Sequence, residues 1–219
     1  MERFIRHEIR ECIGVITLDR ARQFNSLSLA MHHQLTDAIR TLEQNPSVHC
    51  LMIQAEGTHF CAGADLHEVT GLRHSAEQLE IFLRTGLETF RRLEQSPLPV
   101  VIAVQGLALA GGLELVLAGD VVFAAESARL GDQHAQFGLV PGWGGSQRLP
   151  RLIGRRRALE LMLSARWLDA PEALAMGLVN YVVPDAELRE RTFAYCRNLA
   201  GKSRAGLNLM KQLTDRGLD

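Results

Sequence analysis

Two short apolar segments near the middle of the chain constrain its fold more than any other feature. They are LPVVIAVQG (98–106) and DVVFAAES (120–127), and the stretch GLALAGGLELVLAGD (106–120) joins them. Continuous apolar runs of this length are typical of strands that are buried on both faces, and such strands form parallel sheets covered by helices. The two segments therefore predict an α/β fold.

Strand and helix patterns alternate along the rest of the chain. The expected strands are at 12–20, 48–57, 98–106 and 120–127. The expected helices are at 27–46, 75–97, 146–165, 169–177 and 185–200. Because strands alternate with helices up to Gly145 and only helices follow it, we expect largely parallel, covered sheets and then a helical C-terminal part.

Composition limits the expected partners and location. The 219 residues carry a formal net charge of −1 with both signs interleaved, so we expect neither nucleic acid nor an anionic membrane as partner. The four cysteines are widely spread without a CxxC pair, which indicates reduced thiols. The charged N-terminus lacks an apolar signal segment, and no apolar run approaches the roughly 20 residues of a membrane span. We expect a soluble, cytoplasmic protein.

The stretch 106–120 places an acid in an otherwise apolar segment. A turn is expected at Gly106 and a short helix near Gly111, whose N–H, at the first turn of a helix, can meet a developing oxyanion. Glu114 lies three residues on, on the same helical face. Alternatively, Glu114 only complements the helix N-terminus and the glycines only allow close packing. The stretch is neither a P-loop nor a dinucleotide fingerprint, because the residues that follow do not fit.

Two further stretches suit the same kind of site. GTHFCAGADL (57–66) follows an expected strand and offers free N–H groups near Ala64, which could meet the Gly111 N–H at one oxygen. GLVPGWGGSQRLP (138–150) is a glycine-rich loop before a helix and suits a segment that covers a pocket. Its alternative interpretation is a plain helix start with Ser146 as the N-cap.

Together, and in this order, these stretches resemble the crotonase (enoyl-CoA hydratase/isomerase) family. The resemblance covers the chain up to about residue 185. The segments that carry it are LDRARQFNSLS, FCAGADL, GLALAGGLELVLAGDVVFAAESARLG, GLVPGWGGSQRLPRLIG and LDAPEALAMGLVNYVV. It implies a crotonase-like spiral of ββα units over residues 1–185 and a helical, trimerisation-type region over 186–219. Family members usually continue with further helices, so this region is expected to be shortened.

The resemblance also implies an acyl-CoA substrate and the residues that bind it. The N–H groups of Ala64 and Gly111 would form the oxyanion hole that holds the thioester oxygen. No metal and no separate cofactor are expected, because coenzyme A is part of the substrate. The expected assembly is a homotrimer or a dimer of trimers. The residues assigned to substrate binding are Arg22, Ala64, Asp65, Leu66, His67, Gly111, Gly142 and Trp143.

Two of these assignments leave an alternative open. Arg22 lies where family members often carry a basic residue that reaches the CoA phosphates, but it could equally be an exposed surface arginine. Trp143 either limits the length of the acyl chain or packs beneath the covering loop. The segment Ala64-Asp65-Leu66-His67 matches the part that wraps the adenine end of CoA.

The expected catalytic residues are Glu114 and His134. Hydratases of the family use two acids, and Glu114 matches the first. Alignment of the flanking glycines, Gly131 and Gly138, places His134 where the second glutamate would be. An imidazole can donate and accept protons near neutral pH, so hydration is expected with Glu114 as the base and His134 as its partner or as the residue that orients water. Alternatively, Glu114 makes both proton transfers.

Other possibilities remain for this segment and for the remaining histidines. His134 could have only a packing role, and Asp132 or Gln133 could face the pocket instead. The seven other histidines show no metal-ligand spacing and are expected at the surface or as structural caps: His7, His32, His33, His49, His59, His67 and His74.

The leading function is reversible hydration of a 2-enoyl-CoA through an enolate. The alternatives are another crotonase-type reaction, which would be double-bond isomerisation, dehydration of a 3-hydroxyacyl-CoA or decarboxylation, or acyl-CoA binding without catalysis.

Overall fold

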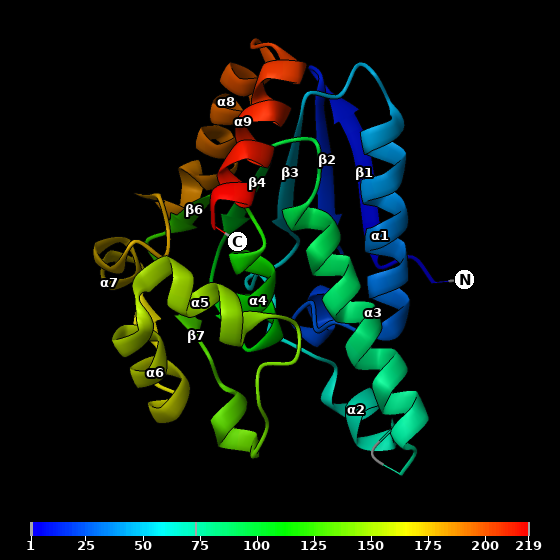
Figure 1. Ribbon diagram of the computed structural model, residues 1–219, viewed down its shortest axis with the longest axis vertical. Helices are drawn as coiled ribbons and strands as arrows, with labels where there is room; N and C mark the ends of the chain where they lie inside the picture. The colour runs from blue at the N-terminus through cyan, green and yellow to red at the C-terminus, as the bar shows by residue number, and fades with distance from the viewer. Residues whose placement is uncertain (1, 73, 219) are drawn as a thin grey trace.

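A six-stranded sheet organises the computed structural model, which describes residues 2–72 and 74–218 (Figure 1). Its order is β1-β2-β3-β4-β6-β9, and only β1 and β2 pair antiparallel. The strands are β1 (Ile5–Arg10), β2 (Ile13–Leu18), β3 (Cys50–Ala55), β4 (Val100–Val104), β6 (Val121–Ala125) and β9 (Tyr181–Val183). The expected α/β class and the largely parallel sheet are confirmed.

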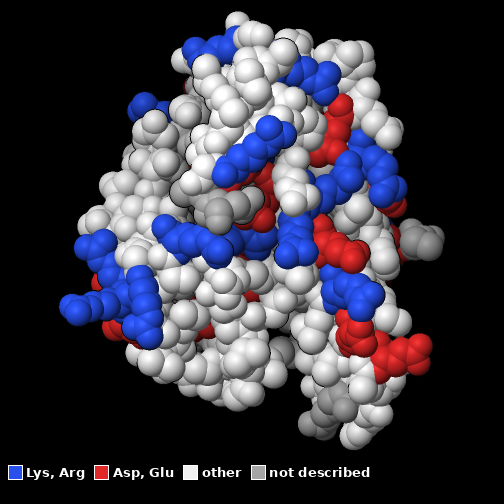
Figure 2. All heavy atoms as spheres, in the orientation of Figure 1, with Lys and Arg blue, Asp and Glu red and all other residues white. Residues whose placement is uncertain are grey.

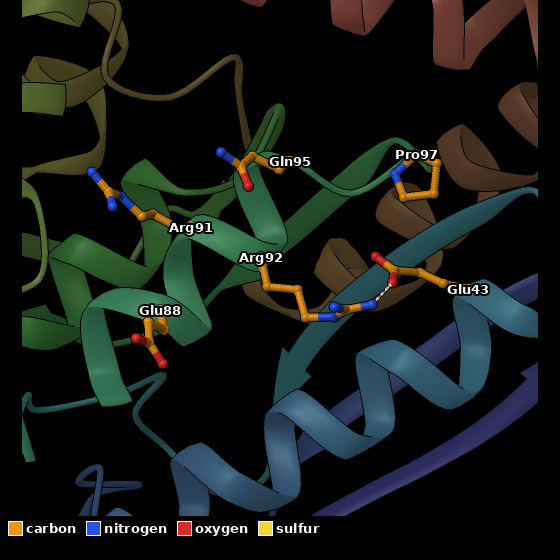
Figure 3. A pocket seen from close by; sticks show the side chains of 6 residues that line it. All are labelled: Glu43, Glu88, Arg91, Arg92, Gln95 and Pro97. Atoms are coloured by element: carbon orange, nitrogen blue, oxygen red, sulfur yellow. Dashed lines mark hydrogen bonds and ion pairs between the residues drawn. The ribbon is translucent and has the colours of Figure 1, made fainter. Parts of the chain in front are cut away.

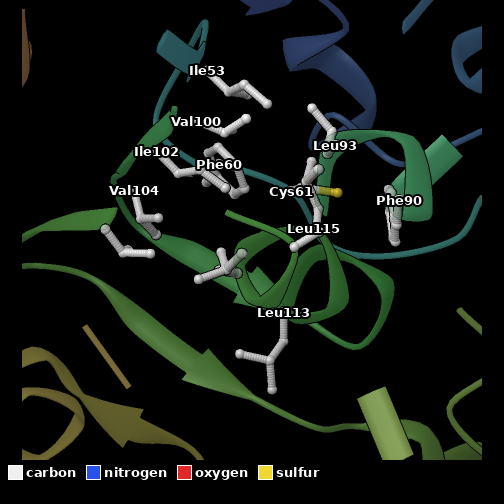
Figure 4. Close-up of a cluster of buried hydrophobic side chains, with 14 of the residues drawn as sticks. Ile53, Phe60, Cys61, Phe90, Leu93, Val100, Ile102, Val104, Leu113 and Leu115 are labelled. Atoms are coloured by element: carbon white, nitrogen blue, oxygen red, sulfur yellow. The ribbon is translucent and has the colours of Figure 1, made fainter. Parts of the chain in front are cut away.

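The sheet has a covered face on each side, because successive side chains of a strand point to opposite faces. In β2, Ile16 and Leu18 join the larger core cluster, whereas Ile13 and Val15 join a second cluster with α8 (Leu188–Ala200). The first face is covered by α1 (Leu29–Gln44) and α3 (Ala76–Glu94), which pack against each other. Figure 4 shows part of this cluster, with Leu93 of α3 near side chains of β3 and β4.

A smaller sheet of order β5-β7-β8 lies beside short helices. Its strands are β5 (Leu107–Leu109), β7 (Arg129–Gly131) and β8 (Leu168–Asp169). The expected short helix near Gly111 is confirmed as α4 (Gly111–Leu117). The described residues also form a short helix and 3-10 turns: α2 (Leu66–Leu72), η1 (Ala21–Gln23), η2 (His134–Phe137) and η3 (Asp185–Glu187).

The C-terminal part is mostly helical, as expected, but it also supplies β8 and β9, which were not expected after Gly145, and one expected helix differs. Residues 146–165 form two helices, α5 (Gly145–Ile153) and α6 (Arg155–Ser164), and not one. Gly154 separates them at φ 83° and ψ 149°, a positive-φ conformation that interrupts the helix and that glycine adopts at little cost. The last helices are α7 (Ala170–Met176), α8 and α9 (Arg204–Leu218). Lys211 connects α9 to the residue before β6, because its Nζ donates to Asp120 Oδ2 at 2.8 Å.

Candidate functional site

The ends of two paired strands bring the central residues together. β5 and β7 are parallel, and Leu109 is in register with Gly131. The carboxyl ends of parallel strands meet at one edge, so the residues after them become neighbours. Gly111 begins α4 just after β5, and His134 begins η2 just after β7. The N–H of Ala110 donates to the carbonyl of Gly131 at 2.9 Å and fixes this junction.

The Glu114 carboxyl group is buried between α4 and the loop before α5. The residue is only 1% exposed. Its Oε1 accepts the N–H groups of Trp143 and Gly145, both at 2.8 Å. The first N–H groups of α5 lack an intrahelical partner, and this carboxylate supplies one. Glu114 therefore holds the glycine-rich loop against α4. The carboxylate complements the start of α5 and not, as the alternative interpretation held, the start of its own helix α4. Ser146 is not the N-cap of α5, because that position is Gly144.

The two expected oxyanion donors lie side by side. Ala64 forms a bridge with Leu27, and the neighbouring Cys61 forms one with Ala108, so the 61–64 loop runs against β5. A Cβ added to Gly111 would lie 3.4 Å from the Ala64 nitrogen. In the described part of the chain, neither the Ala64 N–H nor the Gly111 N–H donates to a protein acceptor. Two free main-chain donors therefore lie together next to α4.

Backbone strain accompanies this geometry. Ala110, directly before Gly111, has φ 48° and ψ −117°. Glycine populates this region readily, but a side chain makes it costly, by about 1–3 kcal/mol. Such strain persists only where the surroundings impose it, and here it sets the direction of the peptide that carries the Gly111 N–H.

His134 faces Glu114, as the alignment of the flanking glycines implied. It is 9% exposed, and its Nε2 lies 3.5 Å from Glu114 Oε2. Its Nδ1 lies 3.0 Å from Asp132 Oδ1. Burial lowers the pKa of His134, but the interactions with Asp132 and then Glu114 outweigh it and raise the pKa from 6.5 to about 9. The ring is therefore cationic at neutral pH.

The two neighbours of His134 do not take its place. Asp132 is buried against the far side of the imidazole ring, as the Nδ1 contact shows. Gln133 turns away and donates through Nε2 to the carbonyl of Ala165. Of the three candidates in this segment, His134 is thus the one whose side chain meets Glu114.

Trp143 packs beneath the covering loop, which is one of its two expected positions. It is 2% exposed, and its ring lies 4.6 Å from that of His32 and 5.5 Å from that of Phe82, measured between centroids. A Cβ added to Gly111 would collide with the indole. Trp143 therefore fills the space immediately behind one oxyanion donor.

His32 lies neither at the surface nor at a helix cap, so the expectation for it is wrong. It is fully buried among Phe82, Phe90 and Trp143. Neither ring nitrogen has a partner among the described residues, and burial followed by the charge of His33 lowers its pKa to about 3. A usable signal existed, because His32 shares the helical spacing of Leu35 and Ile39 on the buried face of α1.

The residues assigned to CoA are more dispersed. Asp65 Oδ2 accepts from Arg20 at 2.6 Å, and Asp65 Oδ1 accepts the N–H groups of His67 and Glu68 at the start of α2. Leu66 and His67 are exposed, and so is Arg22 in η1. Gly142 is half-buried in the covering loop. The structure thus gives Asp65 a structural contact and leaves Leu66, His67 and Arg22 accessible.

A surface hollow elsewhere contains none of these residues. It lies between the C-terminal ends of α1 and α3 and is lined by Glu43, Glu88, Arg91, Arg92, Gln95 and Pro97 (Figure 3). Arg92 pairs there with Glu43.

On the face in Figure 2, Lys and Arg side chains cross the middle with Asp and Glu among them. Ion pairs between such groups include Arg148 with Glu94.

The described residues offer neither a metal-ligand cluster nor a membrane-spanning helix. No group of three or more His, Cys, Asp or Glu side chains among them could hold a metal ion. None of the described helices is both long and apolar enough to cross a bilayer.

Known proteins resemble the chain over nearly its full length. The family model for enoyl-CoA hydratase/isomerase matches residues 8–219. A probable enoyl-CoA hydratase of Mycobacterium bovis is 33% identical over 94% of this chain and 79% of its own length. The 1,2-epoxyphenylacetyl-CoA isomerase of Escherichia coli is 35% identical over 97% of this chain and 82% of its own. The crystal structure of an enoyl-CoA hydratase from Bacillus anthracis has a TM-score of 0.95 and 37% identity, covering 99% of this chain and 84% of that one.

Proposed function

This chain belongs to the enoyl-CoA hydratase/isomerase family, and from that premise we propose that it reversibly hydrates a 2-enoyl-CoA. Its fold is that of the crotonases, as the TM-score with the Bacillus anthracis enzyme shows. Its relatives are named for hydratase and isomerase activities, and the chain is an enzyme of that type. The particular reaction is our proposal.

One observation carries the choice of reaction. A buried carboxylate and an imidazole face each other at 3.5 Å, close to two main-chain N–H groups that have no protein acceptor. Hydration needs a base for water, a proton donor for the α-carbon, and donors that stabilise the enolate. The site supplies one candidate for each role.

The proposed steps assign one role to each group. The N–H groups of Ala64 and Gly111 bind the thioester oxygen. Glu114 takes a proton from water as the water oxygen bonds to the β-carbon, and the electrons of the double bond move toward the thioester to form the enolate. The α-carbon then takes a proton from His134, and the proton on Glu114 returns to His134. Each oxyanion donor is worth about 10²–10³-fold in rate.

Substrate binding and assembly complete the proposal. Arg22, Leu66 and His67 are accessible for the CoA portion, and Gly142 and Trp143 lie on the acyl side. CoA is part of the substrate, so the proposed reaction uses no cofactor. The homotrimer or dimer of trimers and the cytoplasmic location stay predictions, to be checked by sedimentation and fractionation.

Isomerisation is the second candidate, because a named isomerase relative is 35% identical over 97% of the chain. The same pair of groups could move a proton between two carbons of an acyl-CoA without adding water. Because the oxyanion donors would serve both reactions, substrate tests must separate them.

A panel of thioesters tests the proposal. Purified protein is offered crotonyl-CoA, a 3-enoyl-CoA and a malonyl-type CoA, and products are identified by mass. The proposal predicts loss of the conjugated-enoyl absorbance and a mass gain of one water with crotonyl-CoA. Turnover of the 3-enoyl-CoA alone would favour the isomerase, and turnover of the malonyl-type CoA alone would favour decarboxylation. No hydration of crotonyl-CoA or a longer 2-enoyl-CoA would reject the hydratase.

A further inference from the structure

We propose that Asp132 is a positioning residue that keeps the shared proton of the His134–Glu114 pair on His134. This inference rests on the proposed function, in which His134 delivers that proton to the α-carbon. Asp132 itself does not meet the substrate in this account, because it lies on the side of the ring away from Glu114.

Two contacts fix the imidazole ring against Asp132. Its Oδ1 lies 3.0 Å from His134 Nδ1, and the same oxygen accepts the main-chain N–H of His134 at 3.3 Å. Asp132 directly follows β7 and is 2% exposed, so the carboxylate has little freedom to move. One oxygen thus holds both the backbone and the ring of His134.

The contacts also determine where hydrogens can lie. An ionised carboxylate only accepts hydrogen bonds, so Nδ1 must carry a hydrogen. With Nδ1–H fixed, the Nε2 of a neutral ring would direct a lone pair at Glu114 Oε2, and two acceptors would face each other. A proton on Nε2 turns this repulsion into an attraction. The second carboxylate, Asp132, favours its location on the ring.

Within the described part of the chain, no other charged side chain competes with Asp132 and Glu114 in setting the protonation of His134. The loop between η2 and α5 carries no charged residue. Helix α6 packs against η2, but its charged residues, Arg155, Arg156, Arg157 and Glu160, are exposed, and Glu160 pairs with Arg166. The pKa of His134 is raised first by Asp132 and then by Glu114, against the effect of burial.

A purely structural role is the competing interpretation. Asp132 could serve only to accept the N–H of His134 in a turn. Asparagine keeps an oxygen for that turn but removes the charge. The two interpretations therefore differ in what Asp132→Asn does to the protonation of His134.

The direct test is a pH titration of the His134 ring by ¹⁵N NMR, with the signal assigned by its absence in His134→Gln. In the unchanged protein we expect a midpoint well above the ordinary value of about 6.5. In Asp132→Asn we expect it to fall by about one pH unit or more. The matched control is Gln133→Ala, which alters the adjacent buried side chain and should leave the midpoint unchanged. An unchanged midpoint in folded Asp132→Asn would overturn the proposal.

The pH profile of kcat is the second readout. Its alkaline limb should move to lower pH in Asp132→Asn by the same amount as the NMR midpoint, because loss of the proton from His134 ends proton delivery. A moved midpoint with an unmoved alkaline limb would overturn the catalytic part. If Asp132→Asn fails to fold, the titration of His134 in the unchanged protein still tests the proposal. A midpoint at or below about 6.5 contradicts it. If the titration midpoint of His134 is raised but the protein does not hydrate crotonyl-CoA, the proposed function is rejected. The delivery of the His134 proton to the α-carbon is then rejected with it.

Discussion

At the scale of single residues, the site depends on the backbone conformation of Ala110, which the side chain of this residue disfavours. Ala110 has φ 48° and ψ −117°, and the next peptide carries the proposed Gly111 donor. Glycine would adopt this conformation without steric cost. The alanine therefore stores strain beside the groups proposed to bind the thioester oxygen.

Replacing Ala110 by Gly should stabilise the protein. Relief of strain gains about 1–3 kcal/mol, and the greater freedom of glycine in the unfolded chain offsets about 0.5–1 kcal/mol. The free energy of unfolding in urea should rise by about 1 kcal/mol. Gly177→Ala, at φ 79° in a helix end far along the chain, is the reciprocal control and should destabilise. A loss of stability in Ala110→Gly would show that its conformation is not strained.

Residue-scale prediction from the sequence succeeded where a motif fixes the position. The flanking glycines located His134, and its side chain does meet Glu114. His32 was misplaced because histidine is usually partly exposed, and its packing against Trp143 depends on a residue far away in the chain. The Asp132 contact depends on the ring orientation of His134, which the sequence does not encode locally.

At the scale of elements, the covering loop and α5 are held by the proposed catalytic base. Glu114 of α4 accepts from Trp143 and Gly145, so the loop cannot move far without breaking both hydrogen bonds. The indole of Trp143 then occupies the space between α1, α3 and Gly111. Under the proposed function, we expect this indole to limit the room beside the thioester.

Removing the Trp143 indole should widen acyl-chain preference. In Trp143→Ala, the ratio of kcat/KM for an eight-carbon 2-enoyl-CoA to that for crotonyl-CoA should rise about tenfold or more. The cavity should also cost about 3–5 kcal/mol of stability. Trp143→Phe, which keeps an aromatic ring, should change the ratio far less. An unchanged ratio in folded Trp143→Ala would mean that the indole does not border the acyl site.

Elements with strong periodicity or a continuous apolar run were predictable, and those with neither were not. The strands at β2, β3, β4 and β6 and the helices α1 and α3 were located within a few residues. β1 was not expected, because it is an edge strand whose charged residues face solvent and leave only Ile5 fully buried. The short β5, β7 and β8 form because of tertiary pairing, and their two or three residues carry no period of their own.

At the scale of the whole molecule, two histidines give the stability opposite dependences on pH. Burial lowers the pKa of His32 to about 3, so its neutral form favours the folded state. Contacts with carboxylates raise the pKa of His134 to about 9, so its cationic form favours the folded state. Both start from an ordinary value of 6.5.

The free energy of unfolding should therefore fall on both sides of about pH 6.5. The contribution of His32 is complete above pH 6.5 and is lost as pH falls toward about 3, because the unfolded chain binds a proton that the folded one rejects. The contribution of His134 is complete below pH 6.5 and is lost as pH rises through about 9. Urea unfolding from pH 4 to 10 measures both.

Single variants separate the two contributions from those of other groups. His32→Leu should flatten only the acid side, and His134→Gln only the alkaline side. The acid side of the curve of unfolding free energy against pH tests His32, and the alkaline side tests His134. If a variant leaves its side of the curve as steep as in the unchanged protein, that histidine does not titrate as described.

The fold as a whole joins the distant segments that make the site. The 61–64 loop follows β3, Gly111 follows β5 and His134 follows β7, so residues from three parts of the chain meet at one end of the sheets. The α/β class and these neighbours could be anticipated from the sequence, whereas the burial of Glu114 under the start of α5 could not. That contact exists only after the helical part has packed.

The role of Glu114 as the base is tested by hydration of crotonyl-CoA with Glu114→Gln, together with acyl-CoA binding to the same protein by calorimetry. We expect kcat to fall about 10²–10⁴-fold while the dissociation constant changes little, because a base is lost and the main-chain donors remain. Unchanged turnover in a variant that binds and folds normally would contradict the proposed role of this carboxylate and the mechanism built around it.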